Sequence, residues 1–123
     1  MKFMTLVKTS STSKATTPPT RELMDGIMKL GMEAGAAGVL VEQGGLMPIE
    51  MGASVQLADD AVTVIDGPYS EAKEWVGGYA VYEVPSKAEA VAWAVKFLEL
   101  HKQFWPGWEG TVEVRQIMQQ PGN

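Results

Sequence analysis

The side chains best suited to chemistry are charged groups at the ends and along the polar faces of expected strands. Asp66 follows a β-branched run and opens the turn sequence Asp66-Gly67-Pro68, where its carboxylate can project into a cleft. Glu113 and Arg115 alternate with valines in the last expected strand, and Lys8 follows the first one. We therefore expect Asp66 to be a catalytic acid or base. Arg115, Glu113 and Lys8 are the expected binding residues for a small polar organic molecule, with Arg115 orienting an anionic group.

Each of these side chains also has a structural interpretation. Asp66 could simply form the turn, because aspartate bonds readily to backbone amides that follow it. Glu113 could pair with Arg115, with Lys8 or with a residue of another subunit. His101, the single histidine, lies near the end of an expected helix, where a positive charge is favourable, so a capping or surface role is expected for it.

Composition limits the other kinds of chemistry. The chain has no cysteine and one histidine, and it contains no phosphate-binding loop or metal-ligand spacing, so we expect no cofactor and no metal. A net charge of −5 without a cluster of lysine or arginine argues against nucleic acid as a partner. The segment 1–8 is interrupted by charge, and no apolar window approaches about 18 residues. We therefore expect no membrane association and a cytoplasmic location.

A polar segment from Asp66 to Tyr79 lies between two β-branched runs, 61–65 and 79–84. Gly77-Gly78 is expected to turn the chain into the second of these strands. Residues 70–75 are expected to form a single helical turn. The segment must therefore leave one strand and return to start the next. Asp66 is its first residue and lies at the end of the first strand.

The rest of the chain supplies the elements that position these residues. Helices are expected from Thr20 to about Ala37 and from Ser86 to about Leu100, the second opened by the capping box Ser86-Lys87-Ala88-Glu89. The apolar arc of the second helix is wide enough to contact another subunit. Strands are expected over 3–7, 39–41, 54–57, 62–65, 79–84 and 111–118, with 54–65 forming a hairpin.

This order of elements predicts one α+β domain over residues 1–123, with two helices on one face of an antiparallel sheet. The first strand, Phe3 to Val7, is apolar on both of its alternating faces, so the second face of the sheet also needs a cover. The same face of a second copy would supply it. We therefore expect a homodimer.

Several motifs resemble the DGPF proteins of the YCII-related family over nearly the whole chain. They include Gly45-Leu46-Met47-Pro48, Val64-Ile65-Asp66-Gly67-Pro68-Tyr69-Ser70-Glu71-Ala72-Lys73-Glu74, Gly77-Gly78-Tyr79 and Val112-Glu113-Val114-Arg115. The resemblance implies a ferredoxin-like fold that dimerises into an α/β barrel. A His–Asp pair is a proposed active site in some relatives, and Asp66 matches its aspartate, whereas the histidine near the first helix has no counterpart here.

Two functions remain open at this stage. The first is acid/base chemistry on, or binding of, a small polar organic molecule in a pocket near the DGP motif. The second is a non-catalytic accessory role through the protein surface, which the resemblance connects with regulation of sigma factors. A cavity lined by both Asp66 and Arg115 would favour the first function, and fully paired side chains without a cavity would favour the second.

Overall fold

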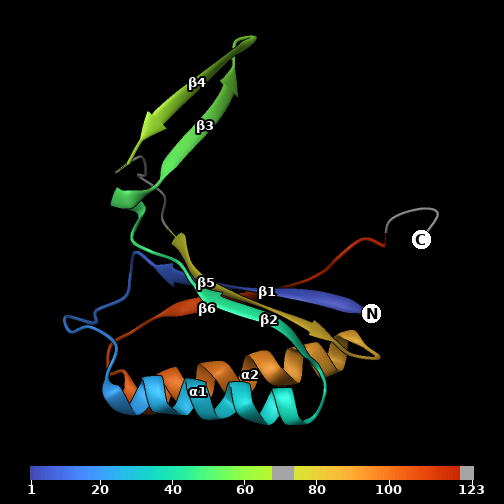
Figure 1. Cartoon of the computed structure of the whole chain (residues 1–123). Coiled ribbons are helices and arrows are strands. Elements are labelled where there is room, and N and C mark those ends of the chain that lie inside the picture. Colours follow the sequence, from blue (N-terminus) through green and yellow to red (C-terminus); the bar gives the residue numbers. More distant parts are fainter. Residues whose placement is uncertain (68–73, 120–123) are drawn as a thin grey trace.

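Two helices cover one face of a four-stranded antiparallel sheet, and a two-stranded hairpin projects on the opposite side (Figure 1). This computed structural model describes residues 1–67 and 74–119. The sheet contains, in spatial order, β2 (Leu40–Gly45), β5 (Glu74–Glu83), β1 (Lys2–Ser10) and β6 (Gly110–Gln116); the helices are α1 (Arg21–Ala36) and α2 (Lys87–Phe104).

The topology confirms the predicted α+β, ferredoxin-like fold. Strand, helix and strand are followed by strand, helix and strand, and the two halves interleave in one antiparallel sheet. A short 3₁₀ helix (η1, Ile49–Met51) and the hairpin of β3 (Ala53–Ala58) and β4 (Ala61–Asp66) are inserted between β2 and β5. The hairpin is thus an addition to the core motif.

Local sequence signals determine where the helices begin and end. The Thr20 side chain accepts a hydrogen bond from the backbone N–H of Leu23, and the Ser86 side chain accepts one from Glu89, as the sequence predicts. After α1, Gly38 adopts a φ of 74°, the left-handed conformation that glycine tolerates best. These signals define both ends of α1 and the start of α2.

The core lies between the helices and the sheet. Phe3 of β1 and Tyr82 of β5 are buried there against Ala34 of α1 and Ala90 of α2. Because side chains alternate along a strand, Met4 and Leu6 point to the other face. We call this face, which neither of the described helices α1 and α2 covers, the open face (Figure 1).

The structure changes several of the predicted element boundaries. Gly77-Gly78 is not a turn: it lies inside β5, next to a register shift in the pairing with β1. The expected helical turn over 70–75 is wrong at its last two positions, which begin β5, while residues 70–73 lie outside the described ranges. Helix α2 continues beyond Leu100 to Phe104. Within the described residues, no helix is long and apolar enough to cross a membrane.

Candidate functional site

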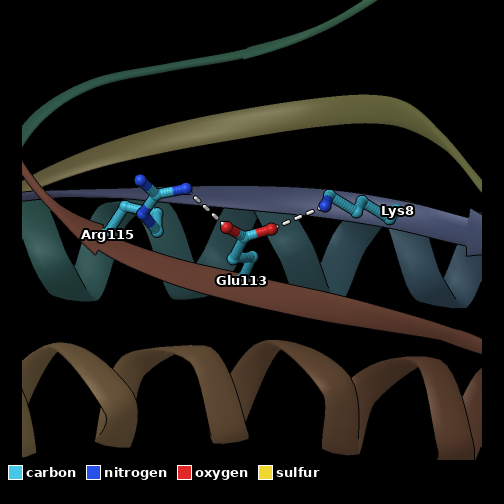
Figure 2. Close-up of polar contacts among 3 residues, drawn as sticks. All are labelled: Lys8, Glu113 and Arg115. Atoms are coloured by element: carbon cyan, nitrogen blue, oxygen red, sulfur yellow. Dashed lines mark hydrogen bonds and ion pairs between the residues drawn. The ribbon is translucent and has the colours of Figure 1, made fainter.

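Lys8, Glu113 and Arg115 meet on the open face, and we call them the ion cluster (Figure 2). Lys8 Nζ lies 2.5 Å from one carboxylate oxygen of Glu113, and Arg115 Nη1 lies 2.9 Å from the other. The pairing of β1 with β6 explains the contact, since Leu6 stands opposite Glu113 and Lys8 is one open-face position along β1. The sequence-predicted binding residues are therefore neighbours.

The electrostatics of the cluster follow from its two cations. Hydrogen bonds from Lys8 and then from Arg115 lower the pKa of Glu113, because they stabilise its ionised form. The Arg115 side chain is 70% exposed, whereas those of Lys8 and Glu113 are only about one-third exposed. Because the Arg115 guanidinium is exposed, it can accept an anionic group.

A second polar pair lies on the same face and was not predicted from the sequence. The Tyr79 hydroxyl donates a hydrogen bond to the Glu42 carboxylate, and this bond raises the pKa of Tyr79. Across the sheet, Tyr79 stands opposite Leu6, which in turn stands opposite Glu113. Tyr79 precedes the apolar Ala80 in a strand, and this alternation indicates that the Tyr79 side chain points to the open face. Gly77-Gly78 suggested a turn at this point instead.

Asp66 does not join the ion cluster. It is the last residue of β4, where it stands opposite Ala53, and its side chain is exposed. Within residues 1–67 and 74–119, the structure gives the Asp66 carboxylate no hydrogen bond or ion pair. The cavities at the base of the hairpin, beside the N-terminus and on the helix side of the sheet have neither Asp66 nor Arg115 in their described lining.

The nearest hollow to the DGP motif lies at the base of the hairpin. It has a volume of about 380 Å³ and is lined by residues 46–50 and by Trp75, Val76 and Gly77. Glu50 is its single charged residue in the described part of the chain. Pro68 of the motif and the residues that follow it up to 73 lie outside the described ranges.

His101 lies on the opposite side of the sheet from the ion cluster. Its surface placement is wrong, because the residue is only 5% exposed. The signal that sequence reasoning missed is helical spacing. Ala90, Ala94 and His101 are the buried residues of α2, and their spacing places all three on the side of the helix that faces the core. No sequence-predicted site residue contacts it within the described ranges.

The comparison with family models agrees with this architecture. A model described as the YCII-related domain matches residues 1–119. The chain therefore belongs to the YCII-related family. A comparison with curated proteins finds no match.

Proposed function

We propose that this YCII-related protein is a homodimer that binds a small anionic organic molecule at the ion cluster, between the open faces of its two subunits. The observation that carries the proposal is the position of three charged side chains on a sheet face that no helix covers. Charged groups become more selective for an anion when a partner surface excludes water around them. Arg115 binds the anionic group. Glu113, which is itself paired with Lys8, keeps the Arg115 side chain in position.

The apolar surface of the chain supports the dimer. Met4 and Leu6 of β1, which are partly exposed, occupy the open face beside the ion cluster. The hairpin adds Val55, Leu57, Val62 and Val64, which share one side of β3–β4 and are all more than 60% exposed. We call these four residues the apolar hairpin side. A lone two-stranded hairpin is marginally stable in water, so burial against a second copy would stabilise it.

Binding at Arg115 is tested with benzoate as the anionic probe. In an NMR titration, benzoate is expected to shift the amide signals of β6, and Arg115→Gln is expected to weaken its binding at least tenfold. Lys102→Gln is the matched control, because it removes the same charge from an exposed position at the end of α2. Equal weakening by both variants would show that only net charge matters and would contradict the site.

Asp66 is the proposed acid or base if the bound molecule is transformed. Its carboxylate is exposed at the end of β4, outside the ion cluster, so this role requires a molecule long enough to extend from Arg115 to the base of the hairpin. Asp66→Asn is expected to keep the melting temperature of the protein, as Asp60→Asn in the hairpin turn should. A fall of several degrees for Asp66→Asn alone would instead assign the carboxylate to the turn.

The second candidate is a non-catalytic accessory role, and the apolar hairpin side favours it. Exposed apolar surface of this kind also suits a different protein partner. The two candidates differ in what benzoate does: an accessory protein has no reason to bind it in an Arg115-dependent way.

A further inference from the structure

A second cavity lies on the helix side of the sheet, away from the ion cluster. Its volume is about 630 Å³, within the range of small-molecule sites, and we call it the helix-side cavity. Strands β1, β2 and β5 form its floor, and residues of α1 and α2 form its walls. Several of the lining residues, including Leu23 and Tyr82, are otherwise buried, so the hollow reaches into the core.

Missing side chains create this space. Gly45 of β2 pairs with Gly78 of β5, and both residues line the cavity together with Gly44 and Gly77. Gly45 points toward the helices, because it alternates with Gln43, whose side chain lies against Gly31 of α1. A Cβ atom added at Gly45 would meet nothing within 4 Å. The sheet is thus bare where α1 faces it, and a ligand could lie flat on the backbone.

One end of the cavity is built from aromatic rings. Trp105 and Trp108 are stacked, with ring centroids 5.8 Å apart, and His101 lies 4.5 Å from the Trp108 ring. The Trp105 indole N–H donates to the Thr17 carbonyl, and that of Trp108 donates to the Thr9 hydroxyl. These bonds join the segment after α2 to the loop before α1 and to the end of β1. The rings are therefore held in place before any ligand arrives.

His101 supplies one directed polar atom. Its Nδ1 lies 3.0 Å from the Phe97 carbonyl oxygen, and a carbonyl only accepts, so Nδ1 must be the donor. Burial lowers the pKa of His101, which keeps the ring neutral at pH 7. In the neutral ring Nε2 is then an acceptor. The described residues give Nε2 no partner, yet they leave no buried side-chain nitrogen unsatisfied, so Nε2 is not fully buried, and His101 is one of the residues that line the cavity.

The lining also excludes charged ligands. None of the described residues that line the cavity is aspartate, glutamate, lysine or arginine. A charged group would lose its hydration there without gaining a counter-ion. The polar groups that remain are hydroxyls, the Gln43 amide and the His101 ring.

We infer that the helix-side cavity binds a neutral molecule with a flat aromatic ring and an O–H or N–H group, which donates a hydrogen bond to His101 Nε2. The ring lies against the bare glycine floor and the Trp105 and Trp108 indoles. This site goes beyond the proposed function and does not depend on it, because it lies on the other side of the sheet and takes a neutral ligand rather than an anion.

Three probes of similar size test the inference by NMR: phenol, anisole, which has the ring without the O–H donor, and benzoate. Phenol is expected to shift the indole N–H signals of Trp105 and Trp108 in a saturable way. His101→Phe keeps the aromatic packing but removes Nε2, so it is expected to weaken phenol binding at least tenfold and to leave anisole binding unchanged. Benzoate is expected to leave the two indole signals unshifted.

A filling variant makes the test independent of His101. Gly45→Leu is expected to fold normally and to abolish the binding of phenol and anisole, because its side chain occupies the cavity. Gly35→Leu is the matched control: Gly35 is exposed on α1, does not line the cavity and also has no neighbour within 4 Å of an added Cβ. The inference is overturned if phenol gives no saturable shift, or if Gly45→Leu binds it as Gly35→Leu does. Arg115→Gln leaves phenol binding unchanged, so failure here is separate from failure at the ion cluster.

Discussion

His101 shows how burial of one side chain makes stability depend on pH. Desolvation lowers the pKa of His101 in the folded protein, and the weaker opposing effect is its hydrogen bond to Phe97. The unfolded chain therefore binds a proton on this residue at a higher pH than the folded chain does. As the pH falls below about 6.5, the unfolded state is stabilised until the lower folded-state pKa is reached.

We predict that His101→Phe removes this part of the pH dependence. Urea unfolding at pH 8 and at pH 5.5 should give a larger loss of the free energy of unfolding in the natural protein than in the variant. The comparison cancels contributions from other titrating groups, such as Glu113, that both proteins share. Equal losses in the two proteins would show that the imidazole is accessible to protons in the folded state.

Sequence reasoning succeeded for Glu113 and Arg115 on β6 and failed for His101 on α2. The two-residue alternation of β6 leaves one choice of face for Glu113 and Arg115, and the contact between them is confirmed. Helix α2 is apolar around much of its circumference, so several stripes compete for the core. The stripe through Val91 and Val95 looked equally good, yet these residues are 40% and 52% exposed.

At the scale of elements, the glycines of the sheet act through close approach rather than through unusual backbone angles. The structure gives neither Gly67 nor Gly78 a positive φ. A Cβ at Gly67 would collide with the Ile49 carbonyl oxygen, and one at Gly78 would lie 3.2 Å from that of Gly44. The sequence predicted that these positions need glycine, but which backbone approaches them depends on tertiary packing.

We predict that Gly78→Val lowers the free energy of unfolding by about 1–3 kcal/mol, because the added side chain forces β2 and β5 to shift. Gly67→Val should also destabilise the fold by displacing η1. Gly77→Val is the adjacent control, since a Cβ there would meet nothing within 4 Å. Denaturant unfolding of the three variants measures the effect. If Gly77→Val costs as much as Gly78→Val, backbone conformation and not crowding requires the glycine.

At the scale of the whole molecule, the order of elements was sufficient to predict an α+β domain with two helices on one face of an antiparallel sheet, and the family resemblance implied the ferredoxin-like topology. Helix, strand and hairpin signals follow one another with little ambiguity, and few sheet topologies accommodate that order. The hairpin itself was predicted, and Asp59 and Asp60 form its turn with φ of 53° and 63°. Its projection from the sheet was not predictable, because the local sequence of a hairpin does not indicate whether its two strands pack on the core or extend away from it.

That projection makes the dimer testable by a single charge. The proposed homodimer should sediment at about twice the chain mass of 13.3 kDa. Leu57→Glu places a carboxylate on the apolar hairpin side, where Leu57 is 73% exposed and stands opposite Val62. We expect this variant to shift the equilibrium toward monomer, because burying the charge in the interface carries a desolvation cost.

Gln56→Glu is the matched control for the dimer, because it adds the same charge to the neighbouring residue, which points to the polar side of β3 beside Thr63. Sedimentation at micromolar concentration should find this variant as dimeric as the natural chain. If the natural chain is a monomer there, the dimer proposal is wrong. If the dimers of Leu57→Glu and Gln56→Glu are weakened equally, the added net charge opposes association and the apolar hairpin side is not the interface. The open face of the sheet would then be the remaining candidate for the contact between subunits.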